Sequence, residues 1–181
     1  YGVLKTKAIT SGPAIAANNI YAYSIASFSD TITVFAPGLV GQVGEITVAL
    51  SPTWSVSVDG IGRAQALSGL SGSSAIDTTA STRRAELIKN SSTGLRFTSA
   101  AFNDGVAVPF DFPMTATWSF RFGQAVTFSA NLRTDSASGS NSSSIADASN
   151  SVYWAGISSV THLGDLVAYT AVSGSGTDWT A

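Results

Sequence analysis

The chain contains one histidine, His162, so any catalytic or metal site built on histidine has to use that residue. A Ser-His-Asp triad also needs a nucleophilic serine in a strained turn, and the sequence contains no Gly-x-Ser-x-Gly motif. There is no cysteine, which excludes disulfides, thiolate catalysis and cysteine-bound zinc or iron. We therefore expect His162 to be a surface histidine in a turn between strands.

The acidic residues offer little more for catalysis. Glycoside hydrolysis usually needs two carboxylates facing each other across a cleft. The chain has only two glutamates, Glu45 and Glu86, and most of its aspartates stand beside Gly, Asn or Ser, where they favour turns. No pair of carboxylates stands out, and the sequence predicts a protein that is not an enzyme.

Oxygen ligands for calcium occur in two places. Asn103 and Asp104 have Asp111 nearby, and the polar stretch after them contains Asp135 and Asp147. No EF-hand pattern or Gly/Asp-rich repeat accompanies these residues. We expect them to form turns and predict no cofactor, with a structural calcium ion as the alternative left open.

Exposed aromatic rings on one face would suggest binding to carbohydrate. Trp154 with its neighbour Tyr153, and Trp179 near the C-terminus, do not fall in phase with a clear apolar strand face. These three residues are the candidate carbohydrate contacts in the sequence.

The elements that must position these residues are strands. Apolar and polar side chains alternate along residues 53–59, 115–122 and 125–133, which predicts antiparallel strands with one face on a core. We expect the last two segments to form a hairpin about Gly123-Gln124. The side chains that this phase turns toward the core are Trp54, Trp118, Phe120, Phe122, Phe128 and Leu132.

Weaker patterns extend this prediction along the chain. Residues 79–89 fit a short helix or an edge strand, and the Ser/Gly/Ala-rich stretches 67–80 and 135–150 are expected to be loops or exposed edges. Many short strands separated by turn residues predict one all-β domain over residues 1–181, an antiparallel β-sandwich of jelly-roll-like form. Further strands are expected at 20–28, 31–35, 45–50, 95–99, 106–110, 151–157 and 166–172.

Composition excludes several function classes. Charged residues make up 11% of the chain and the net charge is −2, with no basic stripe that could meet a phosphate backbone. No run of apolar residues is long enough to span a membrane as a helix. The polar surface must come from Ser, Thr, Asn and Gly, a composition common in exported β-proteins.

Four stretches, taken in order, resemble the bacterial PEP-CTERM proteins, which exosortases sort. They are an early strand pair at 22–33, the alternating segment 123–132 after Gly-Gln, the Ser/Ala/Gly-rich region with the strand that follows it at 135–157, and Ser173-Gly174-Ser175-Gly176 with Asp178-Trp179. The resemblance implies export, sorting at the cell envelope and a role in extracellular matrix, biofilm or floc. It implies no catalytic residues.

These observations lead to one expected function and one alternative. We expect the mature form of an exported protein, located outside the cell or at its surface. Its expected role is a non-catalytic structural one in extracellular matrix or biofilm, through self-association into oligomers or filaments or through contact with exopolysaccharide. Residues 1–12, with Val3, Leu4 and Ile9, form either an arm that adds a strand to a neighbouring copy or an ordinary first strand. The alternative function is a carbohydrate-binding, lectin-like module.

Overall fold

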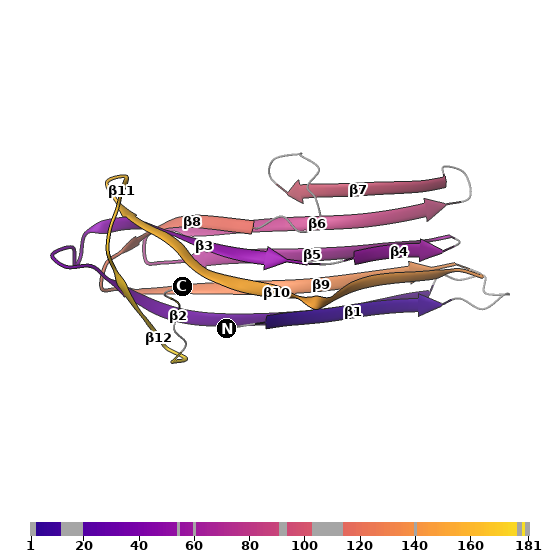
Figure 1. Ribbon diagram of the computed structural model, residues 1–181, viewed down its shortest axis with the longest axis horizontal. Coiled ribbons are helices and arrows are strands. Elements are labelled where there is room, and N and C mark those ends of the chain that lie inside the picture. The colour runs from indigo at the N-terminus through magenta and orange to yellow at the C-terminus, as the bar shows by residue number, and fades with distance from the viewer. Residues whose placement is uncertain are drawn as a thin grey trace.

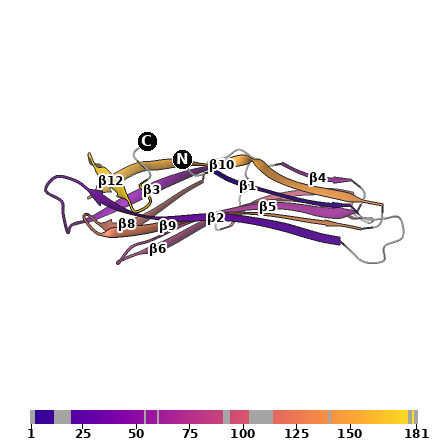
Figure 2. The same ribbon diagram turned by 90° about the horizontal axis from the view of Figure 1, so that it is seen from below.

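The computed structural model describes residues 3–11, 20–53, 55–59, 61–90, 94–102, 114–139, 141–176 and 179. Every regular element in these ranges is a β-strand, and all the pairings between strands are antiparallel. The long strands run along the longest axis of the molecule in two facing sheets, with β10 on one side and β2 on the other when the molecule is turned edge-on (Figures 1 and 2). The predicted all-β sandwich is confirmed.

The strand order within the sheets is that of a jelly roll. Sheet A has the order β1-β10-β3-β8, with β4 beside β3 on the same side of β10 and β11 pairing the end of β10. Sheet B has the order β12-β2-β9-β5-β6-β7. The orders β1-β10-β3-β8 and β2-β9-β5-β6 interleave two Greek keys, as jelly rolls do. The strands of sheet A are β1 (Val3–Ser11), β3 (Val43–Pro52), β4 (Ser55–Asp59), β8 (Met114–Arg121), β10 (Ser143–His162) and β11 (Asp165–Leu166), and those of sheet B are β2 (Ile20–Phe35), β5 (Gly62–Ser73), β6 (Thr78–Asn90), β7 (Gly94–Phe102), β9 (Ala125–Ser138) and β12 (Thr170–Ser173).

The predicted hairpin about Gly123-Gln124 is wrong. β8 pairs with β3 in sheet A, whereas β9 pairs with β2 and β5 in sheet B. The turn between them carries the chain across the sandwich, and Gly123 adopts a φ of 80°, which favours glycine. Alternation gives the same pattern for two strands that pair and for two strands that face each other, so it could not separate these arrangements.

The predicted low-complexity loops are also wrong. Residues 67–73 belong to β5, and most of 135–150 belongs to β9 and β10. β5 lies between β9 and β6, so its backbone is hydrogen-bonded on both sides although few of its side chains are large. Residues 79–89 form neither a helix nor an edge strand, because β6 lies between β5 and β7. The segment 106–110 and Trp54 fall outside the described residues.

The core has two parts of different character. Around β3, β8 and the adjoining parts of β2 and β9 it is large and apolar, and Trp118, Phe120, Phe122, Phe128 and Leu132 are buried as predicted. Burial of each such side chain stabilises the fold by roughly 1.5–3 kcal/mol. We call this part the aromatic half.

The other part, where β1 and β4 flank the first residues of β10, is narrow. Its buried side chains are small, and hydroxyl groups from the two sheets touch: the Thr10 Oγ1 and Ser136 Oγ atoms lie 2.7 Å apart. Ser136 also donates to the Ser144 carbonyl at 2.7 Å. We call this part the narrow half; its buried residues are Thr6, Ala8, Thr10, Ala64, Ser136, Ser138, Ser144 and Ala146.

Candidate binding face

The most conspicuous side chains outside the core lie on the outer surface of sheet B. In β2, Tyr21 and Tyr23 are 72% and 70% exposed, and Ile25 next to them is 57% exposed. Residues two apart on a strand share a face and stand about 7 Å apart. Exposed large apolar groups in a row mark an interaction surface more often than isolated ones do.

The strand register sets polar residues beside these rings. Tyr23 lies opposite Asp135 of β9, and Asp135 lies opposite Gln65 of β5. One row along, Tyr21 lies opposite Ala137, and Ala137 lies opposite Arg63. The register alone therefore brings residues more than a hundred positions apart into one patch.

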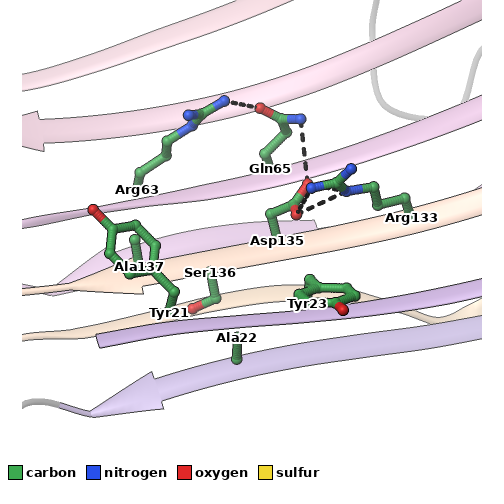
Figure 3. Close-up of a pocket in the computed structure, with 9 residues that line it drawn as sticks. All are labelled: Tyr21, Ala22, Tyr23, Arg63, Gln65, Arg133, Asp135, Ser136 and Ala137. Atoms are coloured by element: carbon green, nitrogen blue, oxygen red, sulfur yellow. Dashed lines mark hydrogen bonds and ion pairs between the residues drawn. The ribbon is translucent and has the colours of Figure 1, made fainter. Parts of the chain in front are cut away.

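Hydrogen bonds link the polar side chains (Figure 3). Arg133 makes a forked pair with Asp135, donating from Nη2 to Oδ1 at 2.7 Å and from Nε to Oδ2 at 2.9 Å. Gln65 donates from Nε2 to the Asp135 carboxylate at 3.4 Å and accepts from Arg63. The guanidinium of Arg133 also lies 5.8 Å from the centre of the Tyr23 ring. We call Tyr21, Tyr23, Arg63, Gln65, Arg133 and Asp135 together the tyrosine face.

Asp135 favours the charged form of Arg133. The hydrogen bonds to Asp135, and then its negative charge, raise the pKa of the Arg133 guanidinium above its ordinary value. Arg133 is about half exposed and Asp135 about one-fifth, so this ion pair orders the side chains and contributes little stability. A planar forked pair does hold both groups in one orientation, as a preorganised binding site requires.

A hollow of about 260 Å³ lies within the tyrosine face. The small side chain of Ala137 lines it between the Tyr21 ring and the Arg63 side chain, and Tyr23, Gln65 and Asp135 line the rest (Figure 3). An aromatic ring offers an apolar surface, Arg and Gln offer N–H donors, and the carboxylate and amide oxygens accept. This combination suits a ligand that has an apolar face edged with hydroxyl groups.

Among the described residues that line the tyrosine face, Asp135 is the one carboxylate, and it is paired with Arg133. Most glycosidases use two carboxylates, one as the acid and the other as the nucleophile or base. Among the described residues no group of three or more His, Cys, Asp or Glu side chains lies close enough to hold a metal ion.

The sequence placed the carbohydrate contacts elsewhere. Trp179 is 3% exposed: its ring stacks on Phe28 at 6.2 Å and its Nε1 donates to Asp30 at 2.8 Å. A ring buried in this way has no face left for a sugar, so Trp179 does not meet the exposure that this prediction required. Tyr153 and Trp154 belong to β10, but their side chains fall outside the described part of the structure.

Trp179 instead belongs to a cluster, together with Ser173 and Ser175, that hydrogen-bonds to Asp30 of β2. We call this cluster the latch. Burial by itself would raise the pKa of the Asp30 carboxyl, but hydrogen bonds from Ser173, Ser175, Trp179 and the Thr31 N–H outweigh burial and lower the pKa to about 2. The Gly174 N–H also donates to the Thr31 carbonyl at 2.7 Å. The Ser-Gly-Ser-Gly segment thus closes on one carboxylate of β2.

His162 is the last residue of β10 and lies directly before a turn, not within one as the sequence predicted. Its Nδ1 lies 2.8 Å from the Val43 carbonyl and its ring meets the edge of Phe122. The hollow beside it, about 390 Å³, contains Asp165 but no serine, threonine or cysteine among its described lining residues. The geometry provides no nucleophile for this histidine.

Of the candidate calcium ligands, the structure describes Asp135 and Asp147, and each of them forms an ion pair. Asp135 is paired with Arg133, and Asp147 is paired with Lys7 at 2.6 Å. Asn103, Asp104 and Asp111 lie outside the described residues.

The strand of the predicted arm is paired: β1 runs antiparallel to β10 from Val3 to Ser11, with Leu4 opposite Val152 and Ile9 half exposed opposite Ile145.

One sequence signal could have found the tyrosine face. Along 21–26 large residues alternate with small ones, Tyr21 and Tyr23 with Ala22 and Ser24, and the large set faces solvent. Sequence reasoning missed this signal because it assumes that large apolar residues face the core. In the narrow half the small residues, Ala22 and Ser24, face the other sheet instead.

Comparison of the sequence with protein-family models and with curated proteins finds no match. Among the described residues, no helix has the length and apolar character needed to cross a membrane. By its fold and its exposed face, the protein is a jelly-roll β-sandwich with a candidate binding surface on one sheet.

Proposed function

We propose that the protein is a non-catalytic structural protein of the extracellular matrix or cell surface that binds polysaccharide through the tyrosine face. The observation that carries the proposal is the pair of exposed rings, Tyr21 and Tyr23, beside the ordered Arg133–Asp135 pair. The uncharged, hydroxyl-rich composition and the resemblance to PEP-CTERM proteins support an exported location.

The mode of binding follows from the chemistry of the face. A pyranose ring has an apolar face of C–H groups that stacks on an aromatic ring, and an edge of hydroxyls that both donate and accept. Tyr21 and Tyr23 supply two stacking positions about 7 Å apart along β2. Arg63, Gln65 and Asp135 supply donors and acceptors for the hydroxyl edge.

The open form of the site favours a chain over a single sugar. The tyrosines stand on an extended strand, and Ile25 next to them is exposed on the same face, so a ligand can continue past the site along β2. Each sugar unit contributes little binding free energy at this site. A polysaccharide chain that contacts many copies of the protein at once is nevertheless held firmly, because the separate contacts act together. Weak, repeated contact suits a matrix component.

Affinity electrophoresis through gels that contain neutral or acidic polysaccharides tests this proposal. Tyr21→Ala and Tyr23→Ala should each weaken binding about tenfold, because a stacked ring contributes roughly 1–1.5 kcal/mol. Tyr21→Phe should bind nearly as well as the unchanged chain, since the stacking surface remains.

Leu166→Ala is the matched control, because Leu166 is 77% exposed but lies in β11 of the other sheet. Its mobility in the gel should not change. The proposal fails if no polysaccharide retards the protein, or if the tyrosine variants are retarded as strongly as Leu166→Ala.

A further inference from the structure

β1 is an edge strand with a single partner. It pairs with β10 from Val3↔Tyr153 to Ser11↔Ser143, and its other edge pairs with no described strand. β10 is paired on its far side by β3 and β4, so it remains part of a sheet when β1 leaves. In Figure 1, β1 lies along the margin of the molecule beside β10.

The inner face of β1 holds it weakly. From Lys5 to Ser11, the part of β1 whose side chains the structure describes, the buried side chains are Thr6, Ala8 and Thr10, each 3% exposed, and none of them belongs to the hydrophobic core cluster. The Thr6 Oγ1 has no hydrogen-bond partner within the described residues. The free energy of burial scales with apolar area, so β1 is held mainly by backbone hydrogen bonds and little by packing.

The groove that β1 fills is selective. Its walls are side chains of the narrow half, among them Ala146, Ser144 and Ser136, and the Thr10 hydroxyl already touches Ser136 across the sandwich. A strand with a large residue at the position of Ala8 would clash in such a space. The groove therefore accepts a strand with a small residue at every second position.

The outer face of β1 adds a charge match. Lys5 and Lys7 point to solvent, and the Lys7 Nζ lies 2.6 Å from the Asp147 carboxylate of β10. A strand entering in another register would lose this pair. The sequence of β1 meets the size, spacing and charge requirements together, and an identical segment from a second copy meets them equally.

We propose that β1 exchanges between copies of the chain, so that the β1 strand of one molecule completes sheet A of another. β1 makes the same contacts in a second copy as in its own chain. The free-energy cost of exchange is therefore only that of detaching a weakly packed strand. Eight residues separate Ser11 from Ile20, and such a segment spans up to roughly 27 Å when extended. This inference is independent of polysaccharide binding.

Cysteine pairing tests the exchange directly, because the chain has no cysteine of its own. Ile9 and Ile145 lie opposite each other on the outer side of β1 and β10. Copies with Ile9→Cys and copies with Ile145→Cys, carrying tags of different size, are mixed at high concentration and oxidised. Exchange predicts a disulfide-linked dimer that contains one copy of each kind, seen on a non-reducing gel.

Two controls frame this experiment. Ser71 and Ser129 lie opposite each other on β5 and β9, two interior strands of sheet B, so mixed Ser71→Cys and Ser129→Cys copies should give no mixed dimer. The double variant Ile9→Cys/Ile145→Cys, oxidised at high dilution, should close its own disulfide and stay monomeric. A mixed dimer no more abundant than that of the Ser71/Ser129 pair would overturn the proposal.

A second measurement guards against variants that fail to fold. A fluorescent peptide with the sequence of residues 3–11 should enter the unchanged protein slowly and raise its fluorescence anisotropy. The same peptide with Phe in place of Ala8 should not enter, because the narrow half has no room for the ring. Equal incorporation of the two peptides, or of neither, would show that the groove of β10 does not exchange its strand.

Discussion

Replacing Gly72 by alanine should damage the aromatic half of the core from the opposite sheet. Gly72 lies in β5 and faces Trp118 of β8, whose ring is 1% exposed. A Cβ atom at Gly72 would fall well inside van der Waals contact with three indole atoms, Cδ2, Cε2 and Cζ2. The glycine is therefore the space into which the indole fits.

The size of the effect follows from the rigidity of the site. Optimal contact between carbon atoms is about 3.5–4.0 Å, and an enclosed indole has no free rotation by which to restore it. Overpacking of a core costs about 1–3 kcal/mol, and we expect Gly72→Ala to lie near 3 kcal/mol. Trp118→Ala should cost about 3–5 kcal/mol through lost burial and a cavity.

The double variant separates the clash from other causes. With the indole gone, the new methyl group enters empty space, so Gly72→Ala/Trp118→Ala should be no less stable than Trp118→Ala alone. Urea unfolding followed by far-UV circular dichroism gives each free energy of unfolding. Gly69→Ala is the matched control in the same strand, because the three atoms nearest to its Cβ would all belong to the side chain of Asn131, which is exposed and can move.

Two results would refute this reasoning. One is a loss of less than about 0.5 kcal/mol for Gly72→Ala, the range of ordinary surface changes. The other is an equal loss in the presence and absence of Trp118, which would mean that the methyl group acts on the backbone and not on the ring.

Two further predictions concern the latch and the turn histidine. The pKa of Asp30 is lowered from 3.8 to about 2 in the folded protein, so its contribution is fully present above pH 3.8 and is lost as the pH falls toward 2. Because the carboxylate is only partly buried, solvent screens its interactions and we expect a contribution of about 1 kcal/mol. Thermal unfolding between pH 5 and pH 2 should show the loss in the unchanged chain and a flatter profile in Asp30→Asn. Identical profiles would contradict a stabilising role for the hydrogen bonds to Asp30. His162→Ala should leave polysaccharide retardation unchanged. It should lower the free energy of unfolding by about 0.5–1 kcal/mol, because the hydrogen bond to the Val43 carbonyl is lost. A hydrolytic activity that disappears in this variant, with folding intact, would contradict the proposed non-catalytic role.

The sequence by itself determined the class of fold and the phase of the strongest strands. In 115–122 and 125–133 apolar side chains recur at every second position and most of them are large, so burying them against one core permits one orientation of each strand. Trp118, Phe120, Phe122, Phe128 and Leu132 are accordingly buried. The sequence predicted a surface histidine in a turn, and His162 is instead the last residue of β10, half-buried and directly before the turn.

Only the tertiary structure decided which strands pair and which face each other. β8 and β9 follow one another with the same alternation, yet they lie in different sheets, since alternation reports burial and carries no information about the neighbour. The two Gly/Ser/Ala segments became strands for different reasons. Trp118 of the facing sheet fills the space over Gly72 in β5. In the narrow half the two sheets come close enough for small side chains, such as Thr10 and Ser136, to touch.

The candidate site depends on this pairing most of all. Tyr21, Arg63 and Asp135 are far apart in sequence, and nothing in the spacing of their residues predicts that β2, β9 and β5 are neighbours. At β2 the narrow half also reverses the usual rule that large apolar side chains face the core. Small side chains lie between the sheets there, and Tyr21 and Tyr23 face outward. A surface made from three strands exists only once the register joins them, and register is a property of the folded sheet.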